Sequence, residues 1–160
     1  MFLFISLLTY LVILMLFYFL ISGKDKLNAK LYPFYGRELQ ATLKADEELK
    51  GRILDLSPTT LFIIKSIFYI ILLFVLGIFM RTGDFFKNFA NLFIFGQIVN
   101  LFDLGVVKLL YFRNSKRVRF TNYQEKELYL DAKSNYYIFL ISIILFTCVA
   151  ALDGALLLLF

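Results

Sequence analysis

Long apolar runs separated by polar segments dominate this chain. A run of about 20 apolar residues is long enough to cross the hydrocarbon core of a membrane as a helix. Four segments fit this description: residues 2–22, 60–80, 88–112 and 136–160. The pattern therefore predicts an all-α polytopic membrane protein in which residues 1–160 form a single domain of four transmembrane helices.

The first apolar run, residues 2–22, has two interpretations, a cleaved signal peptide or a retained span. A secretory signal peptide starts with basic residues and ends at a small-residue cleavage site. In this chain no Lys or Arg precedes the run, whereas Lys24 and Lys26 follow it. We therefore expect a retained span.

The composition agrees with this pattern. The chain is 61% hydrophobic and 18% charged, whereas an ordinary soluble domain is about 45–50% apolar. A soluble chain of this length leaves roughly a third of its area in water. Because water would then meet much of the apolar surplus, we expect that surplus to face lipid.

Basic residues gather in two of the three segments that connect the spans. Residues 23–59 carry seven Lys or Arg and residues 113–135 carry six, whereas the short connection after the second span carries only Arg81 and Lys87. Lys and Arg concentrate in the cytoplasmic loops of membrane proteins. Both basic segments are therefore predicted to be cytoplasmic, in a bacterial plasma membrane, with both termini outside.

The first cytoplasmic segment is predicted to hold an amphipathic helix over residues 35–56, with a break near Ala45. Its apolar positions share one arc at 3.6 residues per turn, and they are Leu39, Leu43, Leu49, Ile53 and Leu56. Asp46 followed by two Glu residues is typical of a new helix start. Two interpretations stay open, a helix on the membrane surface or an element that docks a cytosolic partner.

The second cytoplasmic segment begins with four basic residues, Arg113, Lys116, Arg117 and Arg119. Basic side chains beside the cytoplasmic end of a span attract anionic headgroups by about 1 kcal/mol each. We predict contact with anionic membrane lipids, the alternative being that these residues only set the topology. The stretch is short and juxtamembrane, so a nucleic-acid partner is not expected.

The third span carries a polar stripe. At 100° per residue, Gln97, Asn100, Asp103 and Lys108 fall within an arc of about 140°. A central charge facing lipid costs about 2.5–3.5 kcal/mol on the insertion scale, so we expect the stripe to face other helices or water. Lys65 is the predicted ion-pair partner of Asp103, because in an α-helix Lys108 at i+5 points away from that carboxylate.

The residue composition of the chain disfavours catalysis. The chain has no His, and its one cysteine, Cys148, forms no internal disulfide and no cysteine zinc site. Asp153, the second membrane carboxylate, differs from Asp103 in depth by roughly 12 Å if the spans are straight. An aspartyl protease needs two carboxylates that share a proton. We therefore expect no enzyme, no catalytic residue, no metal and no cofactor.

Short motifs along most of the chain resemble those of a known family. They are Tyr32-Pro33, Asn100-Leu101-Phe102-Asp103-Leu104, the segment 113–120 and Tyr129-Leu130-Asp131. Their order is similar to that in small four-span membrane proteins of Gram-positive, Clostridium-like bacteria, loosely labelled ABC-transporter permeases and without an established activity. Members tend to carry an acidic residue where Lys108 stands and a His where Asn135 stands, which implies that a proton or metal site built on those groups would be lost.

Three functional interpretations follow. The first is a non-enzymatic accessory, regulatory or protective membrane protein, whose partner is a second copy or another membrane or cytosolic protein. The alternative is a small transporter subunit in which the polar stripe lines a pathway after oligomerisation. An intramembrane enzyme ranks third, and the sequence indicates no substrate.

Overall fold

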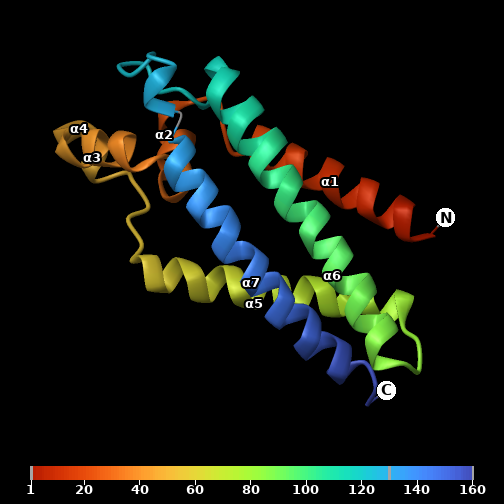
Figure 1. The fold of residues 1–160 in the computed structure, drawn as a ribbon. Helices are drawn as coiled ribbons and strands as arrows, with labels where there is room; N and C mark the ends of the chain where they lie inside the picture. The colour runs from red at the N-terminus through yellow and green to blue at the C-terminus, as the bar shows by residue number, and fades with distance from the viewer. Residues whose placement is uncertain (1, 130, 160) are drawn as a thin grey trace. The chain divides into compact units, whose positions relative to one another are not determined.

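The computed structural model of this protein describes residues 2–129 and 131–159. Within this part every regular element is helical, and the only extended pairing is an isolated bridge between Phe120 and Tyr123. The predicted all-α class is confirmed (Figure 1). In chain order the elements are α1 (Phe2–Leu20), α2 (Asp25–Asn28), η1 (Ala29–Phe34), α3 (Arg37–Ala45), α4 (Glu47–Lys50), α5 (Pro58–Met80), α6 (Phe85–Phe102), η2 (Asp103–Phe112), η3 (Lys116–Val118), η4 (Glu127–Tyr129) and α7 (Ala132–Leu156).

Within the part of the chain that the structure describes, three helices are long and apolar enough to cross a membrane. They cover Pro58–Met80, Phe85–Phe112 and Glu127–Leu156. These helices correspond to the second, third and fourth predicted spans. Each begins earlier in the sequence than predicted, and the last also ends earlier. The described apolar helix at Phe4–Leu20 is shorter, so the crossing by the first span stays a prediction. The three long helices are consistent with a membrane-embedded protein.

The chain divides into two compact units, each assembled from separate stretches of sequence. Unit 1 contains Met1–Leu11, Pro58–Phe102 and Phe139–Phe160. Unit 2 contains Val12–Ser57 and Asp103–Ile138. The single predicted domain is thus organised around two separate sets of contacts, and each unit is described by itself below.

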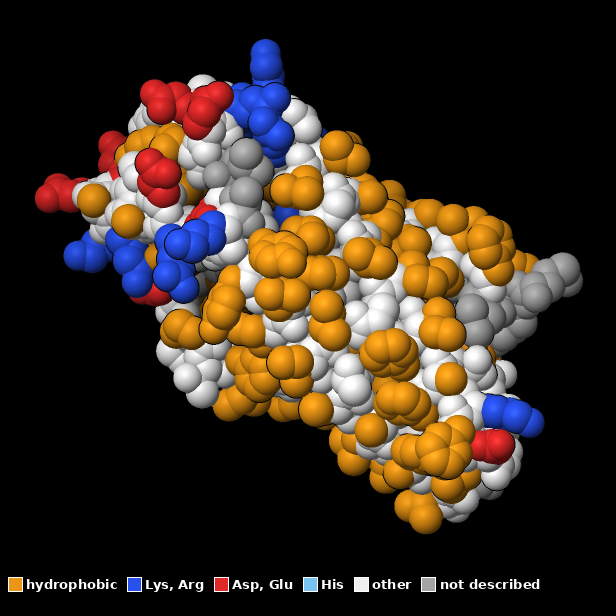
Figure 2. Space-filling model, in the orientation of Figure 1, with side chains coloured by type: hydrophobic (Ala, Val, Ile, Leu, Met, Phe, Trp, Pro, Cys, Tyr) orange, Lys and Arg blue, Asp and Glu red, His pale blue; other side chains and the backbone are white. Residues whose placement is uncertain are grey.

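Unit 1 is a set of apolar helices packed through glycines. Gly77 on α5 lies against Leu157, and a Cβ at that glycine would sit 2.5 Å from a methyl carbon of the leucine. Gly96 on α6 lies against the ring of Phe146, with a corresponding distance of 2.6 Å. Small residues allow membrane helices to approach closely. The opposite faces carry exposed hydrophobic side chains, which cover much of the surface in Figure 2.

Unit 2 holds the short helices and most of the charged side chains. Asp46 separates α3 from α4, and its carboxylate accepts hydrogen bonds from the backbone nitrogens of Glu48 (2.9 Å) and Leu49 (3.1 Å). Such an N-cap satisfies amides that the first turn of a helix leaves free. The predicted break near Ala45 is confirmed, whereas the predicted helix up to residue 56 is wrong, because α4 ends at Lys50 and a turn follows.

The amphipathic stretch packs inward within unit 2. Leu39, Leu43 and Leu49 are all buried there. This arrangement differs from a helix that offers its apolar face to the membrane surface, because these leucines already contribute to a protein core. Figure 2 shows the charged side chains gathered over the region of α3 and α4.

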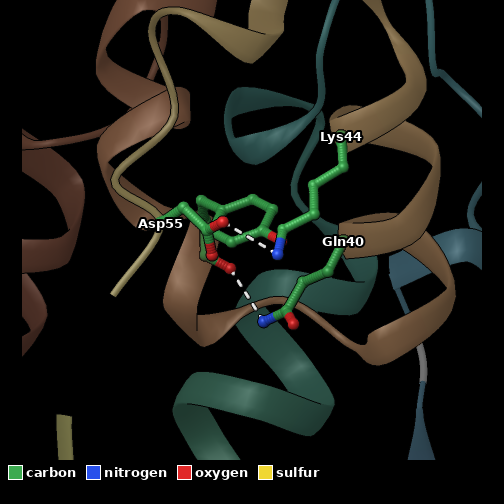
Figure 3. A network of polar contacts seen from close by, with 4 residues as sticks. Gln40, Lys44 and Asp55 are labelled. Atoms are coloured by element: carbon green, nitrogen blue, oxygen red, sulfur yellow. Dashed lines mark hydrogen bonds and ion pairs between the residues drawn. The ribbon is translucent and has the colours of Figure 1, made fainter. Parts of the chain in front are cut away.

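A polar network joins α3 to the residues that follow α4 (Figure 3). Lys44 forms an ion pair with Asp55 at 2.8 Å, and Gln40 donates hydrogen bonds to the carbonyl oxygens of Tyr32 (3.1 Å) and Tyr35 (3.0 Å). The Lys44 and Asp55 side chains are 51% and 49% exposed, so solvent screens the pair and it contributes little to stability. The hydrogen bonds that the Gln40 side-chain amide donates hold α3 against η1 and the residue after it.

Candidate functional site

Two residues of the predicted polar stripe bind a neighbouring helix within unit 1. The Gln97 side-chain amide donates to the carbonyl oxygen of Ile143 at 3.5 Å, and the Asn100 amide donates to that of Phe139 at 3.3 Å. Both acceptors belong to α7. This half of the stripe thus contacts α7.

The other half of the stripe lies in a π-helix. Residues Asp103–Phe112 form the ten-residue segment η2, whose backbone hydrogen bonds join residues i and i+5. The backbone amide of Lys108 therefore bonds to the carbonyl oxygen of Asp103. The expectation that Lys108 points away from Asp103 assumed the 100° step of an α-helix, which this segment does not have, and it stays a prediction. The π-helix is a rare conformation, and the π-helical turns that do occur often lie at functional sites.

Lys108 is buried in unit 2 and is 7% exposed. Its ammonium donates to the carbonyl oxygen of Phe34 at 2.8 Å and lies 5.0 Å from the ring centroids of both Phe34 and Phe112. A cation over aromatic faces is stabilised by the ring quadrupoles. Lys108 thus fastens η1 to η2.

Asp103 opens the π-helix and is partly exposed. Nothing in the described part of the chain donates a hydrogen bond to its carboxylate or forms an ion pair with it. Its predicted partner Lys65 belongs to unit 1, whereas Asp103 belongs to unit 2. The pairing of these two residues stays a prediction.

Asp153 lies on the buried face of α7 in unit 1 and is 0% exposed. Neither carboxylate oxygen has a hydrogen-bond partner among the described residues. The next residue, Gly154, approaches α6 so closely that a Cβ there would lie 3.2 Å from the backbone nitrogen of Phe89. Packed helices therefore enclose this side chain. Its predicted difference in depth from Asp103 stays a prediction.

The four basic residues predicted to contact lipid have unequal surroundings. Arg113 and Lys116 are exposed. Arg119 donates to the carbonyl oxygens of Gln124 (2.9 Å) and Arg113 (3.2 Å), and its buried Nε has no partner in the described part of the chain. Arg119 therefore braces the segment after η3, and its guanidinium is largely committed to the protein.

The two predicted cytoplasmic segments fold onto each other in unit 2. Asn28 donates to the carbonyl oxygens of Arg117 (3.2 Å) and Arg119 (3.0 Å). Tyr35 donates to the carbonyl oxygen of Val118 at 2.9 Å. Sequence reasoning did not find Asn28 or Tyr35, since each partner is more than 80 positions away.

One carboxylate begins two helices of unit 2. Asp131 accepts a hydrogen bond from the backbone nitrogen of Arg37 at the start of α3 (3.2 Å) and another from Ser134 at the start of α7 (2.8 Å). Gly36 makes this possible, because a Cβ there would lie 2.5 Å from the Asp131 Cβ. Sequence reasoning noticed Asp131 only within a motif.

Among the groups of unit 2 with shifted pKa values, Tyr35 and Asp46 link segments that are distant in the sequence. Burial raises the pKa of Tyr35 well above 10.0, so its hydroxyl stays a donor. The pKa of Asp46 is lowered from 3.8, first by the Tyr123 hydroxyl that donates to it at 2.8 Å and also by the two backbone amides that it caps. Asp46 therefore stays charged at neutral pH and holds α4 next to the segment around Tyr123.

These features define a protein whose regular elements, over residues 2–129 and 131–159, are all helical, with three helices there that are long and apolar enough to cross a membrane. Within the described residues no cluster of three or more His, Cys, Asp or Glu side chains could hold a metal ion. Neither models of known protein families, nor curated proteins, nor solved structures gave a match to the chain. The function is therefore argued from the geometry of this molecule alone.

Proposed function

We propose that this chain is a non-enzymatic accessory protein of the bacterial plasma membrane, with four spans, both termini outside and the folded segments of unit 2 in the cytoplasm. The observation that carries the proposal is how its membrane amides are used. Gln97 and Asn100 donate to α7 carbonyls within unit 1. Polar groups that hold helices together are typical of a structural bundle.

The contacts between residues 23–57 and 113–131 support the topology. Segments that fold together lie on the same side of a membrane, and two of the long apolar helices separate them along the chain. Their high content of Lys and Arg favours the cytoplasmic side. On this topology the exposed charges of α3 and α4 face the cytosol, where a protein partner reaches them.

A transporter subunit is the second candidate, and one observation favours it. Asp103 has no hydrogen-bond or ion-pair partner in the described chain and opens a π-helix in a span. Intramembrane carboxylates commonly mark ion pathways. In this alternative a second copy of the chain, or another membrane protein, completes the pathway around Asp103.

Topology is tested with single cysteines in a chain whose exposed Cys148 is replaced by alanine. Cysteine is introduced by Glu48→Cys, Lys126→Cys or Gly83→Cys. A membrane-impermeant maleimide is expected to label the Gly83→Cys variant in intact cells and the other two only after lysis. Labelling of the Glu48→Cys variant in intact cells would contradict the proposed topology.

The two functional candidates are separated by reconstitution and crosslinking of the full chain. An accessory protein reconstituted alone in liposomes moves no ions, and in native membranes photocrosslinkers at Glu38 or Ala41 on α3 give one defined heteromeric product. The lipid-facing position Phe62 is the matched control. Ion flux that Asp103→Asn abolishes would replace the accessory proposal with the transporter alternative.

A further inference from the structure

A preorganised arginine lies at the end of α1 in unit 2. The Arg117 Nε donates to the carbonyl oxygen of Phe19 at 3.1 Å, and the guanidinium carbon lies 3.9 Å from the centroid of the Phe19 ring. The planar guanidinium is thus stacked on an aromatic face, an arrangement that a lysine cannot reproduce.

The backbone around Arg117 is fixed as well. Its amide donates to the Ser115 hydroxyl at 3.2 Å, and its carbonyl oxygen accepts from Asn28 at 3.2 Å. Gly23, in the left-handed region with φ of 112°, leaves room for the guanidinium, because a Cβ there would lie 3.0 Å from the guanidinium carbon. Arg117 is nevertheless exposed, and its two Nη groups have no partner in the described chain.

Two further cations lie close to this site along the chain. Lys24 follows Gly23, and Lys116 precedes Arg117; both are exposed and have no side-chain partner among the described residues. The nearest acidic residue in sequence, Asp25, accepts a hydrogen bond from the backbone of Thr121 at 3.0 Å. A guanidinium with free Nη donors suits an oxyanion such as a phosphate group, and the two exposed lysines add positive charge at neighbouring positions of the chain.

The apolar surface beside the arginine indicates where that phosphate comes from. Phe19 is 48% exposed and Leu20 is 70% exposed, and both lie in the last turn of an apolar helix. A free phosphate ion gains nothing from contact with apolar side chains. A phospholipid places its acyl chains along apolar side chains and its phosphate at the end of the helix.

We propose that Arg117, Lys24 and Lys116 form a binding site for the headgroup of an anionic phospholipid at the end of α1. The site is narrower than the basic run predicted from sequence, since it leaves out Arg119 and recruits Lys24 from the other segment. The inference rests on the proposed membrane topology and is independent of any protein partner.

The site is tested on the purified full chain in nanodiscs of phosphatidylglycerol and phosphatidylcholine, with retained lipids counted by native mass spectrometry. The wild-type chain should retain phosphatidylglycerol preferentially. Arg117→Gln should weaken that preference about fivefold, the equivalent of about 1 kcal/mol per basic residue. Arg117→Lys, which keeps the charge and loses the planar fork, should recover only part of it.

Two further variants separate binding from folding, since Arg117 also holds α1. Lys24→Gln and Lys116→Gln remove ammonium groups that have no polar partner among the described residues, and each should lower the preference in a folded protein. Arg52→Gln is the control of equal charge, because Arg52 is exposed in the same unit. An equal loss in Arg52→Gln and Arg117→Gln, or no loss in any variant, would overturn the proposal.

Added inorganic phosphate distinguishes the two sources of the oxyanion. A lipid site keeps its preference for phosphatidylglycerol in millimolar phosphate, because the acyl chains contribute to binding. Displacement of the lipid by phosphate alone would overturn the assignment to a lipid. The maleimide experiment above reports separately on the topology, so a failure of the site and a failure of the topology are distinguishable.

Discussion

Units 1 and 2 are held together by different means. In unit 1, large apolar side chains fit against glycines, and α6 and α7 share two side-chain hydrogen bonds. In unit 2, many side-chain hydrogen bonds link segments that are more than 80 positions apart, including those of Asn28, Tyr35 and Asp131. Close packing suits helices in lipid, where apolar burial between helices gives little. Hydrogen-bonded loops suit a unit whose many polar groups need partners.

The largest effect is expected from filling a glycine contact in unit 1. Gly96→Ala places a Cβ 2.6 Å from a ring carbon of Phe146 and 3.3 Å from its Cβ, so the two helices must separate. We expect a loss of about 2–3 kcal/mol, measured by thermal unfolding in detergent with circular dichroism. Gly105→Ala in the same span meets nothing within 4 Å and is the matched control. An equal loss in both variants would contradict the glycine-contact account.

Removing the shared cap tests unit 2 in the same way. Asp131→Ala removes the acceptors for Arg37 and Ser134 and should cost about 2 kcal/mol, the sum of two caps at about 1 kcal/mol each. Hydrogen exchange should increase at the first amides of both α3 and α7. Asp84→Ala removes the cap of α6 alone and should cost about half as much. Faster exchange in only one helix of the Asp131→Ala variant would show that the cap is not shared.

Replacing the buried cation should have a smaller effect. Lys108→Met keeps the length of the side chain and loses both the bond to the Phe34 carbonyl and the contact with two rings. We expect a loss of about 1–2 kcal/mol by thermal unfolding. Lys50→Met, at an exposed position of unit 2, should leave stability unchanged. A more stable Lys108→Met variant would mean that burying the charge costs more than its contacts return.

The amides of the polar stripe should each contribute little. Asn100→Leu removes the hydrogen bond to Phe139, and membrane hydrogen bonds of this kind average about 0.6 kcal/mol. Asn91→Leu on the same helix removes an amide without a described partner and controls for added apolar bulk. A loss of several kcal/mol in Asn100→Leu would show that the stripe does more than join α6 to α7.

The smallest effect concerns the acid sensitivity of unit 2. Because the pKa of Asp46 is below its ordinary 3.8 in the folded state, its contribution to stability is complete above that value. The contribution disappears as the pH falls through the lowered pKa. Tyr123→Phe removes the largest cause of the shift and should flatten the fall in stability below pH 4, measured by acid unfolding. An unchanged acid transition would contradict a role for this hydrogen bond.

Local patterns predicted the long helices well, and they also predicted the break before Asp46. Apolar run length decides α5, α6 and α7, and an Asp followed by two Glu residues is a local signal for a helix start. The direction of the Gln97 and Asn100 side chains was predictable, because an amide in a membrane span needs a hydrogen-bond partner and a neighbouring helix supplies one.

Contacts that depend on distant chain segments were not predictable. Asn28 and Asp131 act on backbone groups 91 and 94 positions away, and no periodicity connects such residues. The π-helix was not predictable either, because no local pattern in the sequence marks the change of backbone hydrogen bonding from i+4 to i+5 at Asp103. The basic run was predicted as one patch, yet Arg117 and Arg119 use their guanidinium groups in different ways.

The i+5 backbone hydrogen bonds of η2 determine which residue is bonded to Asp103. With i+5 bonding, the backbone amide that bonds to the carbonyl oxygen of Asp103 is that of the cation Lys108. A tightening to i+4 bonding would put the apolar Val107 in its place. A shift of one position in the backbone bonds thus exchanges Lys108 for Val107 as the residue bonded to Asp103. Deletion of Gly105, where an added Cβ would meet nothing within 4 Å, would bring Lys108 to position i+4, so that an ordinary α-helix would keep Lys108 as that residue.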